Sequence, residues 1–380
     1  MRIGIDARFF GPIGKGLGRY TQKLIENLEK IDKENQYFVF LGRENFEEYK
    51  PQSPNFHKVL ANCPWYSLSE QIKMPWLLNK FQLDLVHFPH FNVPFLYRRK
   101  FIVTIHDLIL LQFPTVKGTT LNPVFYKIKF WAYRFIIWSA IKRAEKIITV
   151  SNFTKKELLK YYRKDLADEK ITVTYEAGSD WEKNEKNTDS KDLGILKKYG
   201  IIKPYLLYVG NAYPHKNLER LVLAFSRLNS DQKYQLVLVG KSDYFYQRLQ
   251  KTIKEKNIKD VIFPEQISDE ILGLIYQRSK VYVFASLYEG FGIPPLEAMS
   301  RNVPVISSDH PCMKEILGES AYFFDGEKEE SIVVAMKKVL EDEEMRKNLI
   351  DKGLQQIKKY SWEKMARETL RVYQKINEKN

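Results

Sequence analysis

The chain has little cysteine and no long hydrophobic run, and each absence excludes a class of protein. Cys63 and Cys312 are the only cysteines in 380 residues, too few for a disulfide framework or a cysteine zinc site. No run of about 18 apolar residues occurs, so the sequence predicts no membrane-spanning helix. Residues 1–6 are typical of a strand and not of a secretory signal peptide. We therefore expect a cytoplasmic location, with peripheral attachment at the inner face of the membrane as an open alternative.

Acidic residues are in deficit, with 47 Asp and Glu against 61 Lys and Arg and a net charge of +14. The basic residues are spread along the chain and often stand beside Glu, as in Lys155-Lys156-Glu157. No nucleic-acid-binding motif accompanies them, which argues against a nucleic-acid partner. Two explanations remain, namely an anionic membrane face or pyrophosphate-bearing lipid, and ordinary solubility charge.

Apolar runs and helical stretches alternate along the whole chain. The runs are 2–7, 37–41, 83–88, 101–105, 146–150 and 171–175 in the first half, and 205–209, 235–239, 261–263, 281–285, 303–307 and 321–324 in the second. Stretches with helical spacing lie between them, for example 19–29, 154–162, 218–228, 246–256 and 269–277. Near-continuous apolar strands separated by helices predict α/β structure, with parallel sheets covered on both faces.

The length predicts two domains, because single cores stop growing at roughly 250–300 residues. The polar stretch 180–192 is the best candidate for a linker. We therefore expect two Rossmann-like domains, over 1–180 and 195–360, with a ligand between them. A final helix over about 361–380 would begin at the N-cap residue Ser361.

The most informative motif is Tyr-Glu-Gly-Phe-Gly-Ile-Pro-Pro-Leu-Glu over residues 288–297. It follows an apolar strand, turns through two glycines and opens a helix at two prolines, which a first helical turn tolerates. Amide groups at Gly292 and Ile293 then predict an anion site, which the helix dipole strengthens. Glu289 and Glu297 would repel a bare phosphate, so we expect them to contact the hydroxyls of an attached sugar. Alternatively, Glu297 only complements the dipole and Glu289 is a solvated acid.

This motif resembles the signature of retaining GT-B glycosyltransferases, that is glycosyltransferase family 4 with the glycosyl transferases of group 1, which include mannosyltransferases. The resemblance implies that Glu289 faces the donor sugar and that Glu297 hydrogen-bonds the ribose of the nucleotide. It also implies that Gly290, Phe291, Gly292 and Ile293 bind the donor. The 195–360 domain would hold the donor and the 1–180 domain the acceptor, with the final helix crossing back onto the N-terminal domain.

A glycine-rich stretch, Gly11-Pro-Ile-Gly-Lys-Gly-Leu-Gly18, follows the first apolar run. It matches neither the dinucleotide-binding pattern nor the P-loop, which argues against a dehydrogenase and an ATPase. We interpret it as a flexible loop that brings the amides of Gly16 and Gly18 to a donor pyrophosphate, as the resembling family implies. A purely structural turn is the alternative.

Four further stretches at strand ends carry candidate residues. His106, followed by Asp107, could have its ring oriented by that acid and offer its other nitrogen to the donor. In the resembling family, a histidine here contacts the donor sugar or shapes the catalytic centre. His87 and His90 either shape the acceptor pocket or only pack.

Gly210 begins a turn toward Lys216, which we expect to stabilise the leaving diphosphate. Asn211 stands where many family members have arginine, which puts a two-cation clamp in doubt. A surface lysine that caps a helix is the alternative for Lys216. Near Ile267 the family holds the nucleotide base through backbone groups.

The segment 124–142 interleaves aromatic and basic residues, and it is either an interfacial helix or a helix buried on the sheet. The prediction as a whole is a retaining, metal-independent hexosyltransferase without a cofactor. It would use a nucleotide-diphospho-sugar, with GDP-mannose slightly preferred, in surface polysaccharide synthesis. The acceptor would be a saccharide or a polyprenyl-linked saccharide. The rival hypotheses are a nucleotide-sugar epimerase and a non-catalytic sugar-nucleotide-binding protein.

Overall fold

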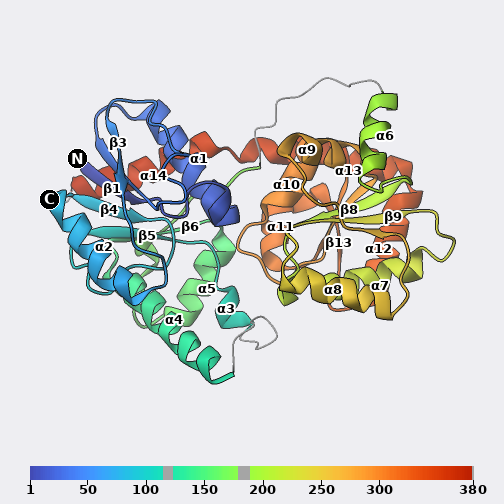
Figure 1. Cartoon of the computed structure of the whole chain (residues 1–380), viewed down its shortest axis with the longest axis horizontal. Helices are drawn as coiled ribbons and strands as arrows, with labels where there is room; N and C mark the ends of the chain where they lie inside the picture. Colours follow the sequence, from blue (N-terminus) through green and yellow to red (C-terminus); the bar gives the residue numbers. More distant parts are fainter. Residues whose placement is uncertain (114–122, 179–188, 379–380) are drawn as a thin grey trace. The chain divides into compact units, whose positions relative to one another are not determined.

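The computed structural model describes residues 1–113, 123–178 and 189–378. Its contacts divide the chain into two compact units (Figure 1). The N-terminal unit comprises Met1–Glu176 and the chain from Ser361 onward, and the C-terminal unit comprises Ala177–Tyr360. Residues 180–188 of the stretch proposed as a linker lie outside the described residues. Its remaining residues, 189–192, belong to helix α6 (Asp189–Lys198).

The N-terminal unit contains one parallel sheet of seven strands in the order β3-β2-β1-β4-β5-β6-β7. The strands are β1 (Arg2–Asp6), β2 (Gln36–Leu41), β3 (Phe56–Leu60), β4 (Leu85–Phe88), β5 (Phe101–Ile105), β6 (Lys146–Thr149) and β7 (Ile171–Val173). The helices are α1 (Lys15–Ile31), α2 (Leu68–Lys80), α3 (Ile109–Gln112), α4 (Pro123–Arg143), α5 (Asn152–Tyr162) and α14 (Trp362–Asn377). Ser361 caps α14 as predicted, because its side chain accepts a hydrogen bond from the Lys364 amide.

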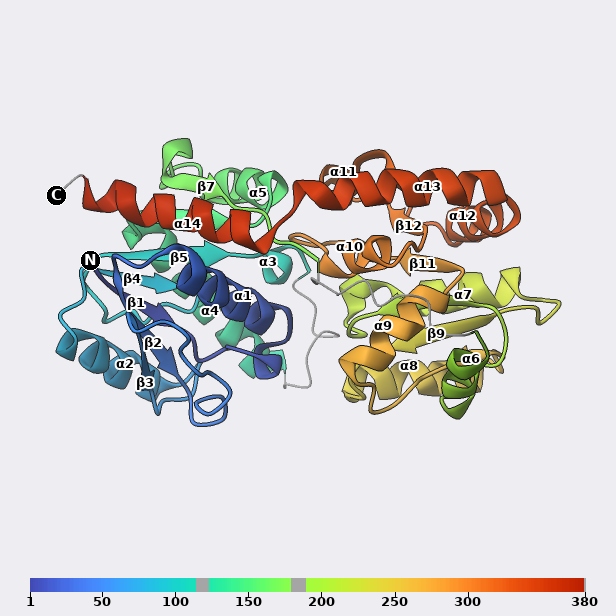
Figure 2. The ribbon, with the colours of Figure 1, turned by 90° about the horizontal axis from the view of Figure 1, so that it is seen from above.

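Alternation along β4 shows how this sheet is covered. Val86 and Phe88 belong to a hydrophobic cluster to which α2, α4 and α5 contribute Met74, Leu78, Tyr133, Ile137, Ala140, Ile141 and Leu158. His87 points to the opposite face, where its Nδ1 lies 2.7 Å from the Tyr373 hydroxyl of α14. On that face α14 lies beside α1 (Figure 2). His87 is fully buried and also bonds Thr104, so it packs the sheet against α14.

The C-terminal unit repeats the design with six parallel strands in the order β10-β9-β8-β11-β12-β13. The strands are β8 (Tyr205–Val209), β9 (Gln235–Val239), β10 (Val261–Ile262), β11 (Val281–Phe284), β12 (Val305–Ser308) and β13 (Ala321–Phe324). The helices after α6 are α7 (Leu218–Leu228), α8 (Tyr244–Glu255), α9 (Asp269–Arg278), α10 (Ile293–Ser300), α11 (Pro311–Leu317), α12 (Glu329–Glu341) and α13 (Glu343–Gln356). In Figure 1, α7, α8 and α12 lie below this sheet, and α9, α10 and α13 lie above it.

These sheets confirm the prediction of α/β structure with parallel strands, and every predicted strand is present to within a few residues. One strand, β3, was not predicted. Its central residues are only half-buried because it forms the edge of the sheet, so its sequence, Phe-His-Lys-Val-Leu, lacks an unbroken apolar run.

Helix α4 spans the whole aromatic and basic segment, with one face buried and another exposed. Tyr133 and Ile137 are buried in the core of the unit. Ile128, Trp131 and Phe135 are 62%, 65% and 47% exposed. Within the described parts of the chain, no helix combines the length and apolar character needed to cross a membrane.

Candidate active site

The centre of the C-terminal sheet is where its strand order reverses, because β8 lies between β9 and β11. Open parallel sheets bind ligands outside the carboxyl ends of the strands at such a switch point. The loops that follow β8 and β11 carry Lys216 and Glu289. A backbone hydrogen bond of 2.7 Å from the Leu287 amide to the His215 carbonyl joins the two loops. Two residues 73 positions apart are thereby brought together.

Lys216 and Glu289 form an ion pair of 2.5 Å between Nζ and Oε1. Their side chains are only 15% and 10% exposed. Burial by itself raises the pKa of Glu289, but the charge and hydrogen bond of Lys216, with smaller contributions from other neighbours, together outweigh burial and lower the pKa. Glu289 is therefore a carboxylate at neutral pH, poised beside a single ammonium group.

His215, next to this pair, does not supply a second cation. Burial and the neighbouring charge of Lys216 lower its pKa to about 4. The His215 imidazole is therefore neutral at neutral pH.

Gly292 is the N-cap residue of helix α10 (Ile293–Ser300), at the turn that the motif predicted. Its φ is +98°, a region that favours glycine, and an added Cβ would lie 2.8 Å from Met313 Cε. Pro294 and Pro295 carry no N–H group, so the amides offered at this end are those of Gly292 and Ile293. They lie three and four positions beyond Glu289, at the positive end of the helix dipole.

Two other residues of the motif are engaged within the C-terminal unit. Glu297 is 3% exposed, and its Oε2 accepts a hydrogen bond of 3.1 Å from the Tyr276 hydroxyl. Phe291 is equally buried, and its ring meets Tyr360 edge-on at 5.5 Å. Gly290, which immediately precedes Phe291, is also buried. The side chain of Phe291 therefore contributes to packing, whereas Glu297 keeps a polar partner.

Three buried tyrosines donate hydrogen bonds to backbone carbonyl groups of the loop after β8. Tyr282 donates to the carbonyl of Val209 (3.3 Å), Tyr246 to that of Gly210 (2.8 Å) and Tyr208 to that of Asn211 (2.8 Å). Gly210 has φ +153°, and a Cβ there would lie 2.6 Å from the Tyr208 hydroxyl. The turn that leads to Lys216 is thus fixed by three successive carbonyl bonds, which sequence reasoning did not detect.

Ile267 lies in the turn between β10 and α9 and is partly exposed. The preceding residue, Gln266, has φ +53°. This turn follows the carboxyl end of an outer strand of the same sheet. It contains no polar side chain whose placement identifies a nucleotide base.

The glycine stretch after β1 differs from the predicted flexible loop. Gly16 and Gly18 lie in the first turn of α1, which begins at Lys15. A Cβ on Gly18 would lie 2.0 Å from the Gly11 carbonyl oxygen and 2.4 Å from that of Phe9, so glycine is needed for close packing. Gly16 has no atom within 4 Å of such a Cβ. A structural requirement therefore explains Gly18 but not Gly16.

His106, at the end of β5, is held by Glu176 and not by Asp107. Its Nδ1 lies 2.9 Å from Glu176 Oε1, and its Nε2 lies 2.9 Å from the Pro89 carbonyl oxygen. Asp107 instead accepts from the Ile109 amide, so the predicted role of Asp107 in fixing the ring is wrong.

Both partners of the His106 ring are acceptors, an arrangement that favours the protonated imidazole, in which both nitrogens donate. Burial alone would lower the pKa of His106, but the hydrogen bond and charge of Glu176 raise it above its ordinary value. In this arrangement the ring has no nitrogen to offer a ligand.

His310 is another residue that sequence reasoning missed. It follows β12, stands 5.1 Å from the Tyr288 ring, and its pKa responds to the charge of Glu289. Burial lowers that pKa to about 4, so the ring is neutral at neutral pH. Its position after β12 and immediately before Pro311, the first residue of α11, could have indicated it.

Comparison with known proteins places these elements in a family. Residues 14–177 match Glycosyltransferase Family 4, and residues 195–356 match Glycosyl transferases group 1. The two matches together account for most of the chain. The chain belongs to this family of glycosyltransferases.

Full-length similarity to individual proteins agrees with that assignment. The glycosyltransferase is 27% identical to O-antigen chain mannosyltransferase B of Escherichia coli, over 94% of this chain and 95% of that protein. It is 29% identical to the O-antigen chain mannosyltransferase RfbU of Salmonella typhimurium, over 87% and 88% of the two chains. Sucrose-phosphate synthase from Thermosynechococcus elongatus has the same GT-B fold, with a TM-score of 0.78, 19% identity and full coverage of both chains.

Proposed function

We propose that this glycosyltransferase moves a hexose from a nucleotide-diphospho-sugar to a saccharide acceptor with retention of anomeric configuration. The observation that carries the proposal is the buried pair of Lys216 and Glu289 beside the amide end of α10. A preference for mannose, as GDP-mannose, rests on similarity to the two O-antigen chain mannosyltransferases. A role in surface polysaccharide synthesis rests on the same similarity.

The ion pair suggests how the donor engages the C-terminal unit. A diphosphate carries more negative charge than one carboxylate, so it competes with Glu289 for Lys216. Lys216 then binds the phosphate oxygens, with the amides of Gly292 and Ile293. Glu289, released from its partner, remains beside the hexose. In this proposal Glu297 and the turn at Ile267 bind the nucleoside, and the tyrosine-held turn at Gly210 and Asn211 positions Lys216.

Charge separation then explains catalysis. As the bond between the anomeric carbon and the diphosphate oxygen breaks, positive charge grows on the sugar and negative charge on the diphosphate. Glu289 stabilises the first, and Lys216 with the helix amides stabilises the second. The acceptor hydroxyl forms its new bond on the face that the diphosphate leaves, and its proton passes to a diphosphate oxygen. In this scheme neither a metal ion nor a cofactor is required.

We assign acceptor binding to the N-terminal unit. Exposed Ile128, Trp131 and Phe135 on α4, with Arg134 stacked 5.1 Å from Trp131, fit contact with an anionic membrane interface. That placement suits a polyprenyl-linked saccharide at the inner face of the membrane. Sedimentation with anionic vesicles at low salt tests it, since a protein that stays in the supernatant would contradict membrane contact.

The experiment that tests the function starts with a thermal-shift panel of GDP-, UDP- and ADP-sugars, followed by assays on whichever donor stabilises the protein. We expect GDP-mannose to stabilise it most, with slow donor hydrolysis and faster transfer when a saccharide acceptor is added. Isomerisation of the donor without an acceptor would instead identify an epimerase. Stabilisation without any turnover would indicate a sugar-nucleotide-binding protein.

A further inference from the structure

An aromatic surface lies beyond the carboxyl ends of β1, β3 and β4 in the N-terminal unit. The three loops there contribute Phe9, then Trp65 and Tyr66, and then His90. Phe9 and Trp65 stack with ring centroids 4.2 Å apart, and His90 meets both Phe9 (5.3 Å) and Tyr66 (6.1 Å) edge-on. Phe9 is buried beneath, Trp65 and His90 are partly exposed, and Tyr66 is 53% exposed. The rings therefore form a surface supported from below.

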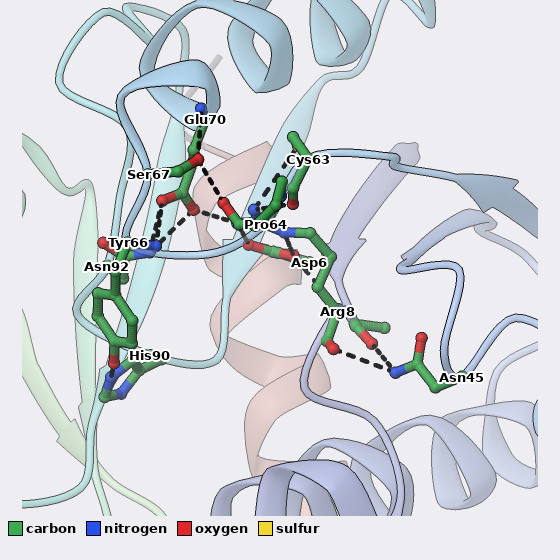
Figure 3. A network of polar contacts seen from close by, with 11 residues as sticks. Asp6, Arg8, Asn45, Cys63, Pro64, Tyr66, Ser67, Glu70, His90 and Asn92 are labelled. Carbon is green, nitrogen blue, oxygen red and sulfur yellow. Dashed lines mark hydrogen bonds and ion pairs between the residues drawn. The ribbon is translucent and has the colours of Figure 1, made fainter.

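A buried polar network joins the same three loops (Figure 3). Arg8, which is 2% exposed, pairs with Asp6 at 2.7 Å and with Glu70 at 2.5 Å. Its Nη1 also donates to the Cys63 carbonyl at 3.2 Å. The guanidinium thus fixes the end of β1 to the loop after β3, two residues before Trp65.

Glu70 and Asn92 complete this connection. Asn92 Nδ2 donates to both oxygens of Glu70, at 2.8 and 2.9 Å, and the Tyr66 amide donates to Glu70 Oε2 at 2.8 Å. Tyr66 has φ +59°, a left-handed conformation that is strained for tyrosine and persists only where the surrounding structure imposes it. The network therefore holds Tyr66 in place. Two of its members are also close in sequence to the other rings, because Arg8 directly precedes Phe9 and Asn92 is two residues after His90.

The surface that results is polar but not cationic. Burial lowers the pKa of His90 to about 3, so its ring is neutral at neutral pH. The Tyr66 hydroxyl lies 2.6 Å from His90 Nε2, which places hydrogen-bonding groups at the edge of the rings. The two carboxyl groups of Asp6 and Glu70 face only one guanidinium, which disfavours an anionic ligand. Aromatic faces with neutral hydrogen-bonding groups suit a sugar ring, whose C–H groups meet the negative π-face.

We propose that Trp65, Tyr66 and His90 form a subsite for an uncharged hexose of the acceptor. This inference rests on the proposed function and narrows it, because an acceptor sugar that carries phosphate or carboxylate would be rejected there. The C–H face of the hexose stacks on the open rings, and its hydroxyls bond Tyr66 and His90. The subsite lies beside the switch point of the N-terminal sheet, where β1 stands between β2 and β4.

The test uses Trp65→Ala, with Trp76→Ala as the matched control on α2 of the same unit. Trp76 is 61% exposed and stacks only on Lys80 among the contacts described. Because the hexose loses one of its aromatic contacts, we expect Trp65→Ala to raise the KM for a mannoside acceptor about tenfold. The KM for the donor should stay unchanged, and Trp76→Ala should match the wild type in both. Tyr66→Asn, which tolerates the left-handed backbone, removes an exposed ring without opening the core.

Saturation-transfer NMR with methyl α-D-mannopyranoside gives a readout independent of turnover. We expect signal in the wild type, strong loss in Trp65→Ala and Tyr66→Asn, and no competition by mannose 6-phosphate. An unchanged acceptor KM in both variants, or no saturation transfer to the wild type, overturns the subsite while leaving donor chemistry intact. Failure of the wild type to turn over any donor would overturn the proposed function. The NMR measurement would still decide, independently of turnover, whether Trp65 binds a hexoside.

Discussion

Replacing Glu289 by glutamine should abolish most transfer while leaving the protein folded. The amide keeps the shape of the side chain and can still accept a hydrogen bond from Lys216, which now lies 2.5 Å from Oε1. It cannot balance the positive charge that grows on the donor sugar. Loss of one such preorganised group typically costs about 10²–10³ in kcat, or ~3–4 kcal/mol. We expect that loss in kcat for Glu289→Gln, with a donor KM no higher than in the wild type.

Stability provides the internal control for this variant. Leaving Lys216 without a charged partner should lower the free energy of unfolding by about 1–3 kcal/mol. Because the pKa of Glu289 is below its ordinary value of 4.5, the pair stabilises the fold above about pH 4.5 and loses that effect as the pH falls further. The difference in Tm between wild type and variant should therefore shrink in acid. Glu319→Gln, which breaks an exposed pair of 3.2 Å with Lys352, should change neither activity nor Tm. Wild-type kcat in folded Glu289→Gln protein would refute the role of Glu289.

Four further results follow from the geometry. Gly292→Ala should lower the free energy of unfolding by ~1–3 kcal/mol in chemical denaturation, because φ is +98°, whereas Gly16→Ala should stabilise α1 by ~0.5–1 kcal/mol. Glu176→Gln should lower the pKa of His106 in an NMR titration. Since that pKa is raised in the wild type, the stabilisation is present below about pH 6.5 and is lost as the pH rises through the folded value. Tyr208→Phe should cost ~1 kcal/mol of stability and raise the donor KM, because one of the three carbonyl bonds of the loop is lost. EDTA should leave the transfer rate unchanged, and a rate restored only by a divalent cation would contradict the metal-independent scheme.

Most of the fold could be predicted because buried parallel strands have a strong local signal. Five-residue apolar runs such as 205–209 and 235–239 coincide with β8 and β9 to the residue. The edge strand β3 could not be detected in this way, since partial exposure admits His57 and Lys58 into its sequence.

The candidate site, too, has features that could be predicted from sequence and features that could not. Lys216 and Glu289 could be brought together from sequence because both follow strands that end at one edge of a parallel sheet. The partners of His106 could not, since Glu176 and Pro89 lie 70 and 17 positions away and only the folded chain selects them over the adjacent Asp107. The sequence could not separate the two explanations of Gly18, because glycine needed for close packing has the same sequence signal as glycine needed for a flexible loop.

The central claim is that Lys216 binds the departing diphosphate and Glu289 does not. Calorimetric titration of GDP and UDP into the wild type, Lys216→Met and Glu289→Gln tests this claim directly. For whichever nucleotide binds, we predict an affinity loss of about 10–100-fold in Lys216→Met, because a charge-assisted hydrogen bond contributes ~1.5–3 kcal/mol. Glu289→Gln should bind at least as tightly as the wild type, since a competing carboxylate is removed. Equal affinity of the wild type and Lys216→Met for both nucleotides would contradict the account.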